Sequence, residues 1–509
     1  MPRTPVNTSV LVLVFFCCVA IQFRQVFQRW GTDILSWVIG TYLEWKHPIL
    51  STDGQQRIPT CPYRFPNGQG DIAKFLEGEK NSKAWGKVHG KLYRLWSGTN
   101  QEIVLSNPED IKIVFRDSDV HAKAKNNDAG WLMSELLGRC VGLITGEEWR
   151  KVRAVTGSTF THKNAAASVS AVWEFTKEHF AKLQEDGKLS SGQINPVEDF
   201  RFLPFWIVAS HLYGPLSPSL KAELRALVPL RESLFRSVIQ GGATRFSGSQ
   251  LLPTKANREL REFKRRWWRF NKEAVQGCLR DKRNAPVVEM YEEMRGGRMD
   301  PENLHQTLDE MLFANLDVTI GAISWNLLFL AANPDIQEEL RIEVQGARIQ
   351  GEPGKPSKSA DEYLLSSTSL LTACTLESAR LKPAAAFTVP QAASTDRVVS
   401  DMVIPAGINF IVDTHALNIR NQYWGPDNEL YRPARFVGRK PSEMRYQYWR
   451  FGFGPRQCMG KHMADLVIRV LLVYLVERFS LSLGPSSSWD KNPKAWISHT
   501  ETQILCEPL

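Results

Sequence analysis

The sequence predicts a mainly α-helical protein with a minor β portion, organised as one large domain that follows an N-terminal membrane anchor. Apolar residues at helical spacing fill the middle of the chain, whereas strand signals are confined to residues 91–105 and to the stretch after Phe387. The chain has 509 residues, of which 43% are hydrophobic and 16 are Trp, which excludes a disordered chain, a coiled coil and a collagen-like fibre. We expect residues 1–45 to form the anchor and an interfacial segment, 46–70 a linker and 71–509 the globular domain.

The N-terminal segment carries a marginal membrane span. Val10–Ile21 is an unbroken apolar run, and its extension to Pro5–Phe23 has 19 residues, close to the roughly 20 that a spanning helix needs. One arginine precedes the run and two follow it closely, which favours a cytosolic position for the rest of the protein. The alternatives are a cleaved signal peptide and a helix in the membrane interface that continues through the aromatic-rich residues 30–45.

Prolines and glycines punctuate residues 46–70, so this segment is predicted to be a linker without a helix or a central strand. Beyond it, Lys91–Trp96 and Gln101–Leu105 flank a turn signal, which predicts a β-hairpin. Short strands and turns are also expected over residues 398–410, and a last hairpin after Phe479.

Three helices are predicted to begin at a proline that follows a capping Asn or Asp, namely at Pro108, Pro301 and Pro334. The second of them reads as one helix over residues 300–332. At 1.5 Å per residue it would be about 48 Å long, enough to cross the whole domain.

Charge and cysteine usage narrow the class of protein. The net charge is +9 and the pI is near 9.1, but the basic residues are scattered rather than gathered into an arm, so no nucleic-acid partner is expected. A basic face for an acidic partner or a membrane surface is the milder inference. The eight cysteines show neither C-x-x-C spacing nor the density of a disulfide framework, which predicts reduced thiols in the cytosol or at its membrane boundary.

One cysteine stands out by its surroundings. Cys458 lies in the Gly-rich loop 451–460, immediately before an apolar helix predicted over residues 461–479. Unpaired backbone N–H groups at a helix start favour a thiolate, and a thiolate in a dry pocket suits an axial iron ligand. The alternatives are a buried core cysteine and an ordinary loop at a helix start.

The loop resembles the haem-binding loop of the cytochrome P450 family, F-x-x-G-x-R-x-C-x-G. Its fixed positions are filled by Phe451, Gly454, Arg456, Cys458 and Gly460. The resemblance implies the cytochrome P450 fold and haem b as the cofactor. It also implies that Cys458 is the axial ligand of the haem iron, that Phe451 packs beside it and that Arg456 contacts a haem propionate.

A second motif lies in the helix predicted over residues 367–381. Glu377 and Arg380 share one helix face, which a surface ion pair would also explain. They resemble the family's E-x-x-R motif because Pro433–Phe436 follows where the family has P-E-R-F. The resemblance implies that Arg435 completes a network that braces the haem loop, and Ala434, in place of the usual Glu, leaves an extra salt link missing.

Trp149 and Arg153 match the family's W-x-x-x-R, and at this spacing both side chains face the same way and can donate to a propionate. The segment after Pro383 lacks the Arg that many relatives direct at a propionate, since Pro390-Gln391 stands roughly there. Haem anchoring is therefore expected to rest on Trp149, Arg153 and Arg456.

The segment Ala314–Thr319 resembles the family's oxygen-activating motif A-G-x-D/E-T-T. Asp317 is kept and would feed protons, but Asn315 replaces the Gly and Val318 replaces the first Thr. Thr319 follows one residue later, rotated about 100° around the helix, and is the candidate hydroxyl. Three explanations stay open: polar groups of the substrate complete the proton relay, Asn315 or Thr319 does so through water, or the reaction abstracts hydrogen without ordinary hydroxylation. For Asp317 itself, the alternative is a solvated or capping acid without a role in the reaction.

By analogy with the family, several segments should surround the substrate. They are the loop 117–138 with Trp131, the helix face with Ala314, Asn315 and Val318, the segment Ala384–Thr388 with Phe387, and the tail near Trp496 and Ile497. Trp131 and Phe387 are equally explained as core aromatics.

The resemblance implies a monooxygenase anchored in the endoplasmic reticulum membrane, with its catalytic domain, residues 71–509, in the cytosol. Electrons would come from NADPH through NADPH-cytochrome P450 reductase, which a basic face could bind. That face would comprise Arg150, Lys151, Arg439, Lys440, Arg445, Arg450 and Lys461.

The sequence looks most similar to ascomycete secondary-metabolite enzymes of this family. Residues 312–319 are similar to those of enzymes in pathways to sulfur-bridged diketopiperazine toxins, which implies a small-molecule substrate derived from a cyclic dipeptide. The alternatives are a haem-thiolate isomerase or dehydratase, oxidative coupling without oxygen insertion, and a non-catalytic haem-binding protein. Asp317 argues against an isomerase.

Overall fold

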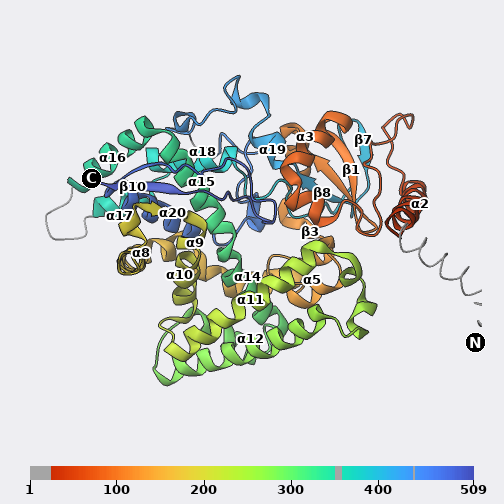
Figure 1. Cartoon of the computed structure of the whole chain (residues 1–509). Helices are drawn as coiled ribbons and strands as arrows, with labels where there is room; N and C mark the ends of the chain where they lie inside the picture. Colours follow the sequence, from red (N-terminus) through yellow and green to blue (C-terminus); the bar gives the residue numbers. More distant parts are fainter. Residues whose placement is uncertain (1–23, 350–357, 440–441) are drawn as a thin grey trace, which may run out of the picture.

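The computed structural model describes residues 24–349, 358–439 and 442–509, so the predicted membrane run Val10–Ile21 lies outside the described residues. Helices make up most of the fold, and the largest sheet lies at one side of it, beside α2 (Figure 1). The helices are α2 Arg24–Lys46, α3 Gly78–His89, α4 Pro108–Phe115, α5 Trp131–Leu136, α6 Gly146–Gly157, α7 His162–Ala167, α8 Val169–Glu185, α9 Pro196–Phe200, α10 Phe202–Tyr213, α11 Pro218–Gln240, α12 Lys255–Arg280, α13 Pro286–Arg295, α14 Pro301–Phe313, α15 Val318–Ala332, α16 Pro334–Ile349, α17 Lys358–Leu365, α18 Leu370–Leu381, α19 Thr414–Asn418 and α20 Lys461–Val476. The strands are β1 Leu92–Ser97, β2 Asn100–Leu105, β3 Ala122–Lys123, β4 Gln193–Ile194, β5 Gln391–Ala392, β6 Arg397–Val399, β7 Met402–Ile404, β8 Asn409–Val412, β9 Phe479–Leu483 and β10 Ile504–Pro508. This composition confirms the predicted mainly α class.

The largest sheet has the strand order β1-β2-β8-β5-β3. The predicted hairpin forms its edge, with Leu92 opposite Leu105 and a turn at Gly98, whose φ of +60° suits a residue without a side chain. Strand β2 pairs in parallel with β8, which brings the segment after Phe387 against the N-terminal hairpin. Strands β6 and β7 confirm the short strands predicted before Phe410, and the pair β9–β10 confirms the last hairpin.

The three predicted proline-initiated helices form as α4, α14 and α16. Asp300 caps α14 by accepting a hydrogen bond from the Glu302 N–H at 2.8 Å. The predicted cap at Asn107 is wrong, because its side-chain amide points to Asp110 instead of the helix N–H groups. Small boundary differences occur as well: α18 begins at Leu370 rather than 367, and α20 ends at Val476 because Phe479 already belongs to β9.

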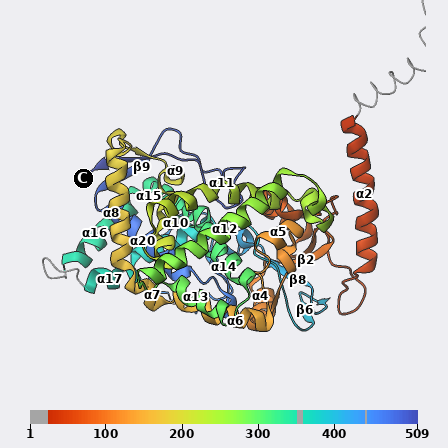
Figure 2. The ribbon, with the colours of Figure 1, turned by 90° about the horizontal axis from the view of Figure 1, so that it is seen from below.

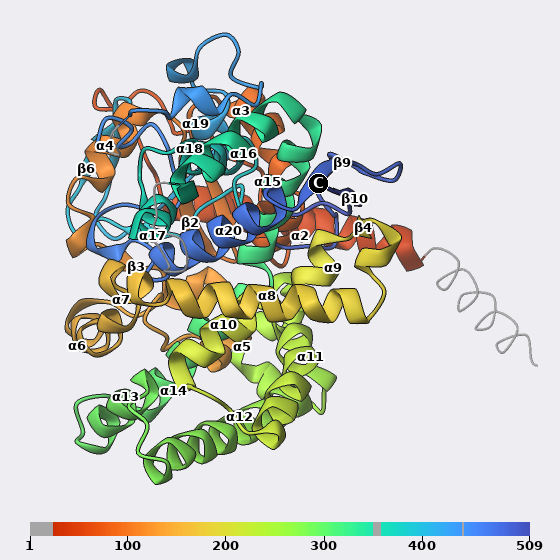
Figure 3. The same ribbon diagram turned by 90° about the vertical axis from the view of Figure 1, so that its left-hand side faces the viewer.

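The long central helix is interrupted where one continuous helix was predicted. Helix α14 ends at Phe313, a 3-10 turn covers Ala314–Leu316, and α15 begins at Val318 after Asp317, whose φ/ψ of −122°/−51° departs from helical values. Among the described residues only the segment Pro301–Ala332 is long and apolar enough to cross a membrane, and its burial identifies it as the core helix. It runs through the centre of the fold, with α20 against it (Figure 3).

Helix α2 stands at the edge of the molecule (Figure 2). Its tryptophans Trp30, Trp37 and Trp45 are each more than 60% exposed, whereas Leu43 packs against Tyr63 in the core. Within residues 46–70, Ile49 and Ile58 are also buried in the cluster that covers the largest sheet.

Candidate functional site

A cavity of about 610 Å³ lies between the central helix and the loop that precedes α20. Its walls include residues from the interrupted part of the central helix, from α6, from β3, from α11 and from the C-terminal tail. The sequence-predicted site residues that line it are Trp149, Arg153, Asp317, Thr319, Phe451, Arg456 and Cys458. The fold therefore brings all of them to one place.

Two glycines shape the loop that carries Cys458. Gly452 and Gly454 have φ values of +83° and +64°, and a Cβ at Gly454 would come within 2.8 Å of Ser118 Oγ. The backbone N–H of Cys458 donates to the carbonyl of Phe451 at 2.8 Å, which closes the loop. The Cys458 side chain thereby faces the cavity.

Opposing effects act on the pKa of the Cys458 thiol. Enclosure by protein raises the pKa of the Cys458 thiol, and the nearby Glu310 carboxylate adds to the rise. The Gly460 N–H and the Arg153 guanidinium act in the opposite direction but do not outweigh burial. A metal coordinated by the sulfur would favour the thiolate form.

Trp149, Arg153 and Arg456 form one cationic wall of the cavity. The guanidinium of Arg456 lies 4.4 Å from the centre of the Trp149 ring and donates to the carbonyl of Ile144 at 2.8 Å. Burial lowers the pKa of Arg153, and it lowers that of Arg456 to about 10.

Sequence reasoning missed Lys123, which lines the same wall. It lies in β3 directly opposite Gln391 of β5, at the place where the expected propionate-binding Arg is absent. Burial, helped by the charge of Arg456, lowers the pKa of Lys123 to about 7. No sequence motif marks this lysine, because its position follows from a strand pairing between distant segments.

The donor set fits haem. Within the described parts of the chain, no ion pair shorter than 4 Å joins Lys123, Arg153 or Arg456 to a carboxylate. Enclosed cations without carboxylate partners are costly, and two carboxylates at this wall would compensate them. The two propionates of haem are such groups, and Cys458 lies on the cavity surface to ligate its iron.

Asp317 is held by two groups. The Trp496 indole N–H donates to Oδ2 at 2.9 Å, and Arg201 lies 3.7 Å from Oδ1. Arg201 also pairs with Glu232 on α11. Because the Asp317 side chain makes no cap hydrogen bond to α15, the capping alternative is wrong.

Thr319 and Asn315 form a hydrogen-bonded pair beside Asp317. Thr319 Oγ1 donates to Asn315 Oδ1 at 3.1 Å, and the Asn315 amide donates to the carbonyl of Met311 at 2.7 Å. Both residues line the cavity, as does Val318, whose side chain cannot hydrogen-bond.

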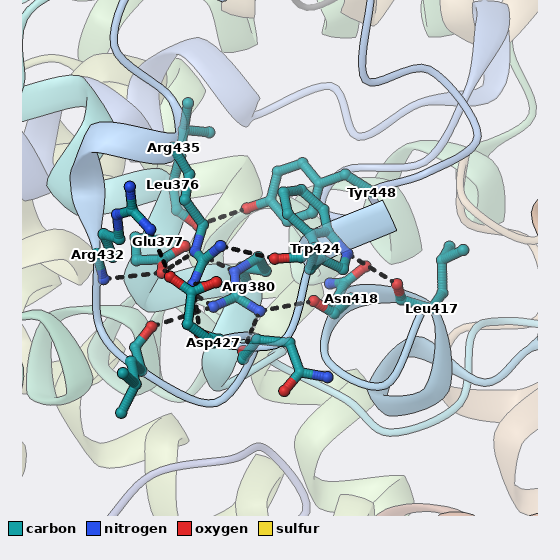
Figure 4. A network of polar contacts seen from close by, with 12 residues as sticks. Leu376, Glu377, Arg380, Leu417, Asn418, Trp424, Asp427, Arg432, Arg435 and Tyr448 are labelled. Carbon is teal, nitrogen blue, oxygen red and sulfur yellow. Dashed lines mark hydrogen bonds and ion pairs between the residues drawn. The ribbon is translucent and has the colours of Figure 1, made fainter. Parts of the chain in front are cut away.

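The predicted Glu377 network is present and buried (Figure 4). Arg380 donates to both carboxylate oxygens of Glu377 at 2.7 and 2.9 Å, and Arg435 Nε donates to Oε1 at 3.2 Å. Asp427 supplies a further link that sequence reasoning missed, since it lies 2.8 Å from Arg435 and also pairs with Arg432. These two arginines lower the pKa of Asp427 to about 2.

The predicted substrate-facing residues divide into two groups. Ala314, Asn315, Val318, Phe387 and Trp496 line the cavity. Trp131 and Ile497 do not: Trp131 packs against the hydrophobic core, and Ile497 is buried behind the wall.

Comparison with known proteins identifies the family. The cytochrome P450 family model matches residues 76–506, which is most of the chain. The chain belongs to the cytochrome P450 family. Among solved structures, a zebra fish cytochrome P450 with progesterone has a TM-score of 0.68 at 16% identity, covering 84% of this chain and 98% of that one, which shows the shared fold.

Fungal relatives are much closer in sequence. Cytochrome P450 monooxygenase aclC of Aspergillus oryzae is 50% identical, covering 91% of this chain and 95% of the relative. Cytochrome P450 monooxygenase asaD of Aspergillus flavus is 42% identical over 99% and 96%, and gliC of Aspergillus fumigatus is 38% identical over 94% of both chains. The chain is thus a secondary-metabolite cytochrome P450 monooxygenase with haem as cofactor and electrons from NADPH through a reductase.

Proposed function

We propose that this cytochrome P450 oxidises a cyclic-dipeptide intermediate on a pathway to a sulfur-bridged diketopiperazine. The observation that carries the proposal is the cavity, which is lined both by Cys458 and by Ala314–Thr319, the segment that differs from the family's oxygen-activating motif. The likeness of residues 312–319 to enzymes of such pathways supports the substrate class. Apolar walls that include Met133 and Phe235 suit the side chains of an apolar cyclic dipeptide.

Each site residue has a role in this proposal. Cys458 is the axial ligand, Phe451 packs beside it, and Trp149, Arg153 and Arg456 hold the propionates. Lys123 adds a third cation where the usual arginine is missing. Haem bound through a thiolate activates molecular oxygen for transfer of one atom to an organic substrate.

Asp317 and Thr319 are proposed to deliver protons. Asp317 takes protons from solvent, being 31% exposed, and Trp496 fixes the direction of its carboxylate. The hydroxyl of Thr319, oriented by Asn315, passes the proton onward, which the apolar side chain of Val318 cannot do. This arrangement favours the second of the three explanations considered from the sequence.

NADPH-cytochrome P450 reductase is the proposed electron donor, docking on a basic face. Arg150, Lys151, Arg439 and Arg445 are exposed and Lys461 is partly exposed, which supports this face. Arg450 does not belong to it, because it is enclosed and pairs with Asp465 at 2.6 Å. Lys440 lies outside the described residues.

We also propose that residues 1–45 anchor the enzyme to the endoplasmic reticulum membrane, that 46–70 form the linker and that 71–509 form the cytosolic catalytic domain. The exposed tryptophans of α2 support an interfacial position for that helix, since Trp favours the boundary between lipid and water.

Growth of the producing strain under ¹⁸O₂ tests the proposed function. Metabolites of the native strain are compared with those of a Cys458→Ala strain. A diketopiperazine that disappears in the variant and carries label in the native strain supports oxygen insertion. If the metabolite that disappears carries no label in the native strain, oxidative coupling or an isomerase or dehydratase is favoured instead. If no metabolite disappears in the variant, a non-catalytic haem-binding protein is favoured.

A further inference from the structure

Glu310 is a carboxylate inside the cavity that the roles above do not use. It lies on α14, four residues before Ala314 and seven before Asp317. All three line the cavity. The cavity-lining positions next to Glu310, namely Met311, Phe313 and Leu316, are apolar.

The loop with Cys140 and Gly142 contacts the Glu310 carboxylate directly. The backbone N–H of Gly142 donates to Glu310 Oε2 at 3.0 Å, and the Cys140 thiol forms a second hydrogen bond to the carboxylate. A Cβ at position 142 would lie 1.9 Å from Glu310 Oε1, so the carboxylate could not keep this position beside a residue larger than glycine.

These two hydrogen bonds leave Glu310 short of partners. An ionised carboxylate offers about four lone-pair sites, of which the two contacts use two. Across the described ranges, no ion pair shorter than 4 Å reaches Glu310, and burial raises its pKa. Lys123 and Arg456 act on it only from a longer distance, and in the proposed function both would hold the propionates. The remaining acceptor sites are therefore available to a donor in the cavity.

We propose that Glu310 binds the substrate by accepting a hydrogen bond from an N–H group, which in a cyclic dipeptide is a ring amide. This inference rests on the proposed function and adds the residue that selects for an unsubstituted ring nitrogen. A ring amide N–H is a rigid donor without charge, so it can satisfy the carboxylate at little cost in conformational entropy. The same contact orients the ring relative to the Cys458 side of the cavity.

The competing explanation is that Glu310 only braces the loop containing Cys140 and Gly142. Two substitutions separate the explanations. Glu310→Gln keeps an oxygen that can accept from the Gly142 N–H but removes the charge, whereas Glu310→Leu removes both. Glu302→Gln is the matched control, because Glu302 lies on the same helix, pairs with Lys264 and does not line the cavity.

The experiment measures dissociation constants with the holoprotein, from the change in haem absorbance on titration. The probes are cyclo(L-Phe-L-Ala) and cyclo(L-Phe-L-Phe), each beside its N,N′-dimethyl form, which lacks the N–H donors. Haem content and thermal stability are recorded for every variant, so that a folding defect is recognised independently of binding.

In the native and Glu302→Gln proteins, we expect N-methylation to weaken binding about 10- to 100-fold, the range of a hydrogen bond to a charged group. In Glu310→Leu this discrimination should fall to less than about 3-fold, and in Glu310→Gln it should be intermediate. Equal weakening of methylated and unmethylated probes in Glu310→Leu, with discrimination retained, would assign Glu310 a bracing role and overturn the inference. If neither dipeptide binds the native holoprotein, the proposed substrate class fails, and this inference fails with it.

Discussion

Trp496 donates its indole N–H to Oδ2 of Asp317 at 2.9 Å, and this bond joins the C-terminal tail to the point where the central helix is interrupted. Arg201 approaches the other carboxylate oxygen, Oδ1, at 3.7 Å. Asp317 therefore has one neutral and one charged partner, and its direction depends on both.

Replacing Trp496 by Phe removes the neutral partner and leaves Asp317 free to turn toward Arg201. We expect product formed per NADPH consumed to fall, with kcat reduced about 10-fold, because a hydrogen bond to a charged group is lost. Trp489→Phe is the control, since Trp489 packs against Phe329 away from Asp317. An unchanged ratio of product to NADPH in Trp496→Phe would show that the direction of Asp317 does not limit proton delivery.

The Thr319–Asn315 pair gives a second prediction. Thr319→Val preserves shape but removes the hydroxyl, so NADPH consumption without product, measured as released hydrogen peroxide, should rise several-fold. Val318→Thr in this background restores a hydroxyl one position earlier and should recover part of the coupling. If Thr319→Val forms as much product per NADPH as the native enzyme, the proton relay must instead be completed by polar groups of the substrate.

The buried Glu377 network predicts two different losses of stability. Glu377→Gln leaves Arg380 enclosed without its carboxylate and Arg435 with Asp427 alone, which should lower the free energy of unfolding by about 3–5 kcal/mol. Asp427→Asn should have a smaller effect, because Asp427 lies at the outer end of the network. Thermal unfolding of the two holoproteins measures the difference, and equal losses would contradict this order.

The Asp427 contribution depends on pH in a defined direction. Its folded-state pKa of about 2 lies below the roughly 3.9 of an unfolded Asp, so the stabilisation is fully present above pH 4 and is lost as the pH falls toward 2. The difference in stability between the native protein and Asp427→Asn should therefore shrink over this range. If the difference in stability instead grew as the pH fell, the ion pairs of Asp427 would not be its cause.

Local sequence motifs predicted the residues of the site better than the contacts that reach the site from distant segments of the chain. The loop around Cys458 and the pair Glu377–Arg380 could be identified because their spacing is fixed within a few residues of chain. Lys123 could not, since it reaches the haem wall through the pairing of β3 with β5, between segments about 270 residues apart. Asp427 was missed for a similar reason, because it compensates Ala434 from a loop rather than from the motif.

The interruption of the central helix was also hidden in the sequence. Asn315 and Asp317 are compatible with a helix, and the apolar pattern runs through them without a break. The 3-10 turn at Ala314–Leu316 accompanies a tertiary contact, the bond from Trp496 to Asp317, and a local one, the pair of Thr319 with Asn315. Helix periodicity predicts the length of such an element but not a local departure held by side chains from elsewhere.

The basic face leads to a prediction for electron transfer. Arg150 and Lys151 are adjacent and exposed on α6, so Arg150→Glu/Lys151→Glu should raise the KM for the reductase, while raised salt weakens transfer to the native enzyme. Arg258→Glu on α12 is the control for a charge change elsewhere on the surface. Salt-independent transfer in the native enzyme would contradict docking by charge.

Lys123 gives the last prediction, because its charge has no carboxylate partner within ion-pair distance until haem is bound. Lys123→Gln should release haem about 10-fold faster than the native protein, since a charge-assisted contact to a propionate is lost while a neutral polar side chain, one atom shorter, remains. Transfer of haem to an excess of apomyoglobin measures this rate. Lys125→Gln, two residues along the chain and exposed, controls for a change of net charge. Equal rates in both variants would place Lys123 outside the haem contacts and leave Arg153 and Arg456 to hold the propionates.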